Sequence, residues 1–196
     1  MFTRPNRVIQ DPPIAKFFFA DTRSAWLWLI VRVYLGYEWI EAGLHKWSPA
    51  WLNGGEALKG FWTTAIAIPE TGRPPIAYGW YRNFIAFLLE TESYTWFAKL
   101  IVFGEILIGI ALILGAFVGI SAFFGGLLNW NFVMAGAAST NAMLFVLAIM
   151  LMMAWKVAGY VGLDYYLLPK LGTPWHSQEG EEEETFDGTV HTGAAA

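Results

Sequence analysis

Three ionisable side chains in one predicted helix have the spacing and chemistry of a proton-transfer site. Glu38, Glu41 and His45 follow one another at i, i+3 and i+7, so they share one face of an α-helix. Close carboxyl groups hold a proton near neutral pH more readily than isolated ones. A metal ion would need ligands from a second helix, where only Glu105 is available. The pattern therefore favours proton transfer or a polar cavity over a metal site.

The segments that position these side chains predict an all-α membrane protein. Of 196 residues, 56% are apolar and 14% are charged, whereas soluble domains carry about a quarter charged residues. About 20 helical residues span the ~30 Å hydrocarbon core, and backbone inside a membrane must be helical. We therefore expect a bundle of four transmembrane helices. The predicted spans are approximately 25–45, 94–115, 117–136 and 141–162.

The segment 46–93, between the first two spans, is the longest predicted connection. Its stretches 55–68 and 78–90 have helical character and are separated by prolines. The second stretch is rich in aromatic residues, which favours the membrane interface. We expect both to lie as short helices on the extracytoplasmic side and to cap the bundle. The other connections are short, so the last three spans should be antiparallel neighbours.

The two ends of the chain are predicted to lie in the cytoplasm. Lysine and arginine near the termini slightly outnumber those of the loop 46–93, as the positive-inside rule requires. Residues 1–24 lack the apolar core of a cleavable signal. Residues 169–196 include an acidic run and are expected to be a disordered tail. The membrane domain is thus 25–168, in the cytoplasmic membrane of a bacterium.

Composition also excludes several kinds of chemistry. The chain contains no cysteine, which rules out thiolate catalysis, disulfide exchange and cysteine-ligated clusters within this chain. Lysine and arginine together number 12 and form no basic stripe, so nucleic acid is not an expected partner. We expect no covalently bound cofactor.

Polar residues inside the predicted spans need partners, because a charge at mid-membrane is costly. Arg32 and Glu105 are predicted at similar depth, and we expect them to pair. Such a pair serves either function or helix register. Asn129 shares a face with small residues, which favours an interhelical hydrogen bond over a ligand contact. Lys46 is expected to extend toward the headgroups.

Several short motifs resemble the DoxX/DoxD family of small four-span bacterial membrane proteins. The resemblance covers about 25–168, and the order and spacing of the motifs carry it. The matching residues are Arg32 and Gly36 followed by Glu41 to Trp47, Trp80-Tyr81 with Phe84-Ile85, Gly104 to Gly109 with Gly115, Asn129 and Asn141, and Gly159 with Gly162-Leu163-Asp164.

The resemblance implies a DoxD-like membrane subunit of a thiosulfate:quinone oxidoreductase, or of another quinone-linked complex. Quinone would be the substrate, and a DoxA-like partner would be a separate chain, because about 30 residues after the last span are too few for a second domain. Proton handling is assigned to Glu38, Glu41, His45 and Glu105. The residues expected to bind quinone or substrate are Arg32, Lys46, Trp80, Tyr81, Arg82 and Asn129.

Two other functions remain open from the sequence. The chain could be a non-catalytic membrane anchor or assembly subunit of a respiratory or redox complex, which its small size favours. It could also be a small transporter of quinone-like or lipidic molecules, although it lacks an inverted repeat. Assembly into a homo-oligomer would favour the transporter function. Whether the chain is itself catalytic is not decided by its sequence.

Overall fold

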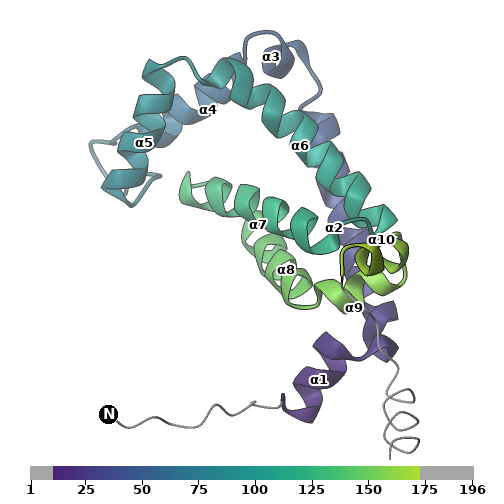
Figure 1. The fold of residues 1–196 in the computed structure, drawn as a ribbon. Coiled ribbons are helices and arrows are strands. Elements are labelled where there is room, and N and C mark those ends of the chain that lie inside the picture. Colours follow the sequence, from purple (N-terminus) through teal and green to yellow (C-terminus); the bar gives the residue numbers. More distant parts are fainter. Residues whose placement is uncertain (1–10, 173–196) are drawn as a thin grey trace, which may run out of the picture.

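The computed structural model describes residues 11–172, and all regular elements in this range are helices (Figure 1). The predicted all-α class is therefore confirmed. Residues 1–10 and 173–196, including most of the predicted acidic tail, lie outside the described residues. The helices are α1 Pro13–Ala20, a 3-10 turn Thr22–Ser24, α2 Ala25–His45, α3 Pro49–Leu52, α4 Glu56–Ile66, α5 Gly79–Glu90, α6 Tyr94–Leu114, α7 Val118–Met134, α8 Asn141–Met153, α9 Trp155–Tyr160 and α10 Asp164–Lys170.

The two longest helices, α2 and α6, pack along each other and form the central axis of the fold (Figure 1). Glycines bring their backbones into contact. A Cβ atom on Gly36 would lie 2.8 Å from the carbonyl oxygen of Gly109, and one on Gly109 would lie 2.6 Å from that of Gly36. Gly43 is equally close to Ile106. Small residues thus permit a close helix crossing, as they do at interfaces between membrane helices.

α7 and α8 form an antiparallel hairpin beside α2 and α6. Gly125 of α7 faces Trp39 of α2, and Gly126 faces Ala148 of α8, where a Cβ would lie 3.4 Å from the alanine methyl. The predicted small-residue contact face of this helix is therefore confirmed. The interhelical hydrogen bond predicted for Asn129 on the same face was wrong, because neither amide atom has a hydrogen-bond partner among residues 11–172. Of the predicted antiparallel neighbours, α7 and α8 lie side by side, whereas α6 and α7 diverge from their connection (Figure 1).

The last predicted span is not one helix. α8 ends at Met153, and α9 begins at Trp155 after a break at Ala154, whose φ and ψ are −90° and 12°. The prediction of a continuous helix over 141–162 was wrong because the apolar sequence continues through the break without a glycine or proline to mark it. The break lets α9 pack against α2 and against α1.

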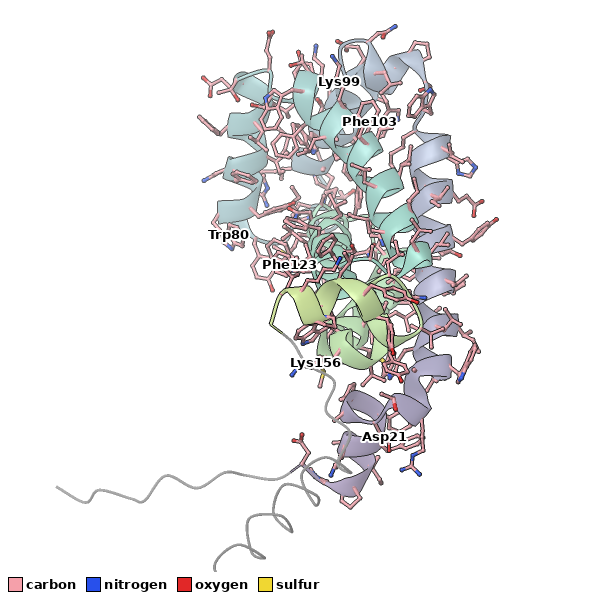
Figure 2. All side chains as sticks on the ribbon, turned by 45° about the vertical axis from the view of Figure 1, so that its right-hand side comes forward. Asp21, Trp80, Lys99, Phe103, Phe123 and Lys156 are labelled. Atoms are coloured by element: carbon pink, nitrogen blue, oxygen red, sulfur yellow. The ribbon has the colours of Figure 1, made fainter. Side chains whose placement is uncertain are left out.

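The segment 46–93 contains three helices, of which α4 and α5 have the predicted boundaries within one or two residues, whereas the short α3 was not predicted. α4 and α5 pack against each other, α4 also contacts α6, and α7 lies between α6 and α8 (Figure 1). Trp80 of α5 lies nearly level with Phe123 of α7 (Figure 2). The helices α4 and α5 therefore form a side wall of the molecule, whereas we expected them only to cap the bundle.

Within residues 11–172, one helix is by itself long and apolar enough to cross a bilayer. This helix is α6, with a mean hydropathy of 2.4. α7 and α8 are apolar but shorter, with 17 and 13 residues. Many large apolar side chains on α6, α7 and α8 are exposed, among them Leu107, Ile120 and Met143, and Phe103 and Phe123 lie between Lys99 at one end and Asp21 at the other (Figure 2).

Candidate functional site

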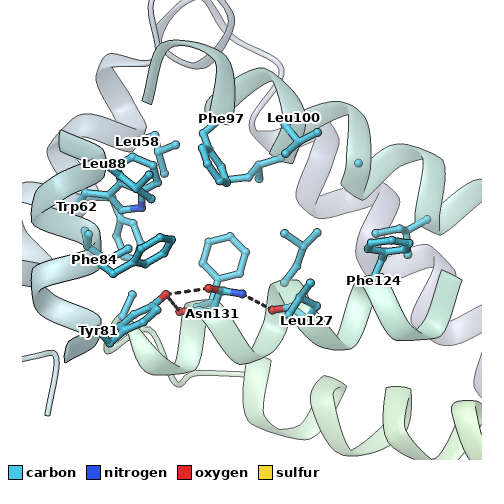
Figure 3. A pocket seen from close by; sticks show the side chains of 18 of the residues that line it. Leu58, Trp62, Tyr81, Phe84, Leu88, Phe97, Leu100, Phe124, Leu127 and Asn131 are labelled. Atoms are coloured by element: carbon cyan, nitrogen blue, oxygen red, sulfur yellow. Dashed lines mark hydrogen bonds between the residues drawn. The ribbon is translucent and has the colours of Figure 1, made fainter. Parts of the chain in front are cut away.

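A large apolar cavity lies between α4, α5, α6 and α7. Its volume is about 590 Å³. α6 and α7 diverge from their connection, and α4 and α5 lie across the open end (Figure 1). The wall is mostly aromatic and aliphatic, and Figure 3 shows these side chains around the space. Prominent lining residues are Leu58, Trp62, Phe84, Phe97, Phe124 and Leu127.

One corner of this apolar cavity is polar. The Tyr81 hydroxyl donates a hydrogen bond shared between the backbone carbonyl oxygen of Asn131, at 3.2 Å, and its side-chain Oδ1, at 3.0 Å (Figure 3). Asn131 Nδ2 donates to the Leu127 carbonyl at 2.7 Å. Burial raises the pKa of Tyr81 to about 12, because desolvation disfavours the phenolate. The corner therefore presents a neutral hydroxyl and a fixed amide.

A second, smaller pocket lies on the opposite face of α7. Its volume is about 150 Å³, and polar side chains from α2, α6, α7 and α8 line it. We call it the polar pocket. Phe132 lines both this pocket and the apolar cavity, so its ring stands between them. The lining residues are Glu38, Trp39, Ala42, Lys46, Glu105, Asn129, Phe132, Thr140, Asn141 and Leu144.

The polar pocket contains a buried ion pair. Lys46 Nζ lies 2.9 Å from both carboxylate oxygens of Glu105, whose side chain is fully buried. The predicted Arg32–Glu105 pair was therefore wrong, as was the prediction that Lys46 extends to the headgroups. Estimates of depth along separate helices do not reveal that Lys46, directly after α2, turns back; its Nζ also donates to the Ala42 carbonyl at 3.3 Å.

Arg32 lies in the first half of α2, outside both cavities. The residue is 1% exposed, and its Nη2 donates to the Val161 carbonyl at 2.6 Å. It packs against Gly115 and Gly162. The nearby carboxylate of Asp164 accepts hydrogen bonds from the backbone N–H groups at the start of α7. Arg32 therefore helps to close the bundle where α6, α7 and α9 meet, and the structure places it away from any quinone-sized space.

The other predicted site residues are dispersed. Glu38 lines the polar pocket, whereas Glu41 is partly buried and His45 is exposed. The three therefore do not converge on one space. Trp80 is 60% exposed and stacks edge-on against Tyr81.

Arg82 Nη2 donates to the Ile76 carbonyl at 3.0 Å, outside both cavities. Of the residues expected to bind quinone, Tyr81 alone lines the apolar cavity, and Lys46 and Asn129 line the polar pocket. Within residues 11–172, no cluster of three or more acidic or histidine side chains is placed to hold a metal ion.

Sequence reasoning missed Trp39, Asn131 and Phe132 as site residues. Trp39 and Phe132 are ordinary apolar residues in sequence, and nothing in their spacing separates them from the core. Asn131 lies two residues after Asn129 in the sequence. That two-residue offset was the available signal, because it places the amides on different sides of α7.

No family model, curated protein or solved structure matches this chain significantly. The resemblance to the DoxX/DoxD family thus remains an expectation from the motifs.

Proposed function

We propose that this chain is a membrane-embedded, quinone-binding subunit of an oxidoreductase, with the quinone in the apolar cavity. The carrying observation is an apolar space of about 590 Å³ whose polar corner is Tyr81 and Asn131. Ligand sites are typically apolar spaces of about 300–1,000 Å³ with a few oriented polar groups. The ion pair of Lys46 and Glu105 lies across the Phe132 ring.

The walls and the corner suit a quinone ring. Aromatic side chains such as Trp62 and Phe97 can stack on a flat ring. The Tyr81 hydroxyl can turn from Asn131 to donate to a quinone carbonyl oxygen. Leu100 and Leu107 line the cavity while 57% and 65% exposed, so the cavity is open to the bilayer beside α6 and an isoprenoid tail can leave there.

The membrane arrangement belongs to the same proposal. α2, α6, α7 and the pair α8–α9 would cross the cytoplasmic membrane of a bacterium, with both termini in the cytoplasm. The exposed apolar side chains of α6, α7 and α8 support this arrangement, because surface patches of this size on a soluble protein would aggregate. The charges of α2 are accommodated inside, since Arg32 is buried and Glu38 partly buried.

The proposal assigns the electrons to a source outside this chain. The sequence has no cysteine for an iron–sulfur cluster and no haem-attachment or dinucleotide motif. A partner subunit, DoxA-like in the expectation from sequence, would supply two electrons from thiosulfate or another donor. The quinone would take these with two protons to form the quinol.

The test is the quinone content of protein purified gently from its native membrane. Solvent extraction and chromatography should give about one quinone per chain in the wild type. Glu105→Gln should lower quinone-linked turnover in the assembled complex more than it lowers protein yield. Quinone at the lipid background would reject the proposal and favour the anchor or assembly subunit.

A further inference from the structure

The polar pocket contains buried polar atoms that no protein group satisfies. Both amide atoms of Asn129, which lines the pocket, lack a hydrogen-bond partner within residues 11–172. The indole Nε1 of Trp39 is also unpaired there, but it lies against Gly125, which does not line the pocket. These side chains are 0% and 3% exposed. An unsatisfied buried polar group costs about 1–3 kcal/mol, so buried polar atoms in native proteins are nearly always paired with protein or water. The pocket therefore requires an occupant that both donates and accepts hydrogen bonds.

The size and position of the pocket fit water. Its volume of about 150 Å³ corresponds to about five molecules at ~30 Å³ each. The pocket reaches from fully buried Glu105 and Asn129 to Thr140, which is exposed in the turn between α7 and α8. An occupant can thus exchange with the surface at this turn.

The charges of the pocket select against anions. Glu38 and Glu105 contribute two formal negative charges and Lys46 one positive charge, which leaves one net negative charge. A dianion such as thiosulfate is repelled by this charge, whereas a proton or another small cation is attracted. The pocket is therefore suited to proton movement and not to binding the anionic donor.

We propose that the polar pocket is a water-filled, anion-excluding proton route from the turn between α7 and α8 to Glu105. Asn129 is a positioning residue that holds the water molecules between Glu38 and Glu105. In the proposed quinone function, on which this last step rests, the route supplies the two protons that accompany the two electrons. Rotation of the Phe132 ring, which lines both spaces, joins the route to the apolar cavity.

Single cysteines test the hydration and charge of the pocket, because the natural chain has none. Ala42→Cys and Asn129→Cys place a thiol in the pocket. Ala122→Cys is the matched buried control, since Ala122 is also on α7 and 0% exposed. Ala138→Cys, in the exposed turn, normalises reagent reactivity. Each variant is treated in sealed membranes with small cationic and anionic methanethiosulfonate reagents.

The pocket thiols should react while the Ala122→Cys thiol does not. After normalisation, the cationic reagent should react about ten-fold faster than the anionic one, because one net charge acts over a few ångströms. Reaction from the external face alone is expected from the proposed orientation. Thiols as inert as the buried control, or equal rates for both reagents, would overturn the proposal. Because the thiol is placed at two positions in the pocket, the test still gives an answer if one of the two variants fails to fold.

A pair of leucine variants separates this proposal from the quinone site. Asn129→Leu should leave quinone content unchanged but slow quinol formation in the assembled complex at least ten-fold. Asn131→Leu, two residues away in the apolar cavity, should lower quinone content. If Asn129→Leu supports wild-type quinol formation, the proton route is wrong while the quinone site stands. If neither leucine variant holds quinone and the wild type holds none either, the proposed function fails. The thiol reactivities still decide in that case whether the pocket is hydrated.

Discussion

Lys46 and Glu105 join the end of α2 to the middle of α6 through a two-pronged contact, with Nζ 2.9 Å from each carboxylate oxygen. The Lys46 ammonium also lies 5.5 Å from the centre of the Phe132 ring. A single side chain thus contacts α6 and the ring that divides the two cavities. This contact links the packing of the central helices to the geometry of the site.

Replacing one member of this ion pair should lower the free energy of unfolding more than replacing both members. Lys46→Met leaves a buried carboxylate without its partner, which costs about 3–5 kcal/mol. The double variant Lys46→Met, Glu105→Met should recover much of this loss, since both charges are gone. Chemical unfolding in mild detergent of the wild type, both single variants and the double variant measures the coupling. Additive effects would show that the two side chains do not interact.

Asp164 should stabilise the junction of α6, α7 and α10. Its carboxylate accepts hydrogen bonds from the N–H groups of Phe117, at 2.6 Å, and Val118, at 2.9 Å. Asp164→Ala removes both acceptors, and hydrogen bonds to charged groups contribute about 1.5–3 kcal/mol each. We expect a clear fall in the unfolding midpoint. Glu56→Ala, which breaks an exposed pair with Lys59, is the control and should change the midpoint little.

Gly115 should tolerate no side chain. It has a φ of +68°, and an added Cβ would overlap the Arg32 guanidinium. Gly115→Ala should therefore destabilise by the cost of the left-handed conformation, about 1 kcal/mol, plus the cost of displacing a buried arginine. Gly72→Ala isolates the first contribution, because Gly72 has a φ of +92° and a Cβ there meets nothing within 4 Å. Equal losses in unfolding midpoint would show that Arg32 does not fill this space.

The Tyr81 hydroxyl should ionise at a higher pH than a free tyrosine, and the stability of the fold should fall as the pH rises through that range. Its pKa rises from 10.0 to about 12 in the folded protein. The stability gained by burying the neutral hydroxyl is fully present below about pH 10 and is lost as the pH rises from about 10 to 12. Ultraviolet difference titration of wild type against Tyr81→Phe should show one phenol ionising near pH 12. Ionisation of that phenol at its ordinary pKa would mean that Tyr81 is not buried.

The sequence predicted local structure better than partnerships. The boundaries 25–45 coincide with α2, and 78–90 nearly coincide with α5, because apolar periodicity, prolines and helix-end residues are local signals. The Arg32–Glu105 pairing failed because depth along a helix does not determine which neighbour a long side chain reaches. The pairing of Tyr81 with Asn131 spans 50 residues, and no local pattern encodes such a contact.

The residues of the polar pocket could likewise be identified one by one from the sequence, but their grouping could not. Glu38, Lys46, Glu105 and Asn129 were identified as candidates by their cost inside a membrane. Their gathering in one pocket, and the place of Trp39 there, depend on how the side chains of α2 pack against α7, where Trp39 lies against Gly125. Contacts of this kind are determined by packing across the whole bundle.

The central claim is that a quinone occupies the apolar cavity, and filling that cavity tests it most directly. Gly104 lines the cavity, and a Cβ there meets nothing within 4 Å. Gly104→Leu should project into the free space without a clash and should gain about 1 kcal/mol of helix propensity. Gly60→Leu is the matched control, because Gly60 is also helical and unobstructed but does not line the cavity.

The decisive measurement is the quinone content of these two variants and the wild type, purified in parallel from native membranes. We predict about one quinone per chain in the wild type and in Gly60→Leu, and a loss of at least ten-fold in Gly104→Leu with no fall in its unfolding midpoint. Equal quinone content in Gly104→Leu and Gly60→Leu would contradict the account, because the ligand would then lie outside the cavity.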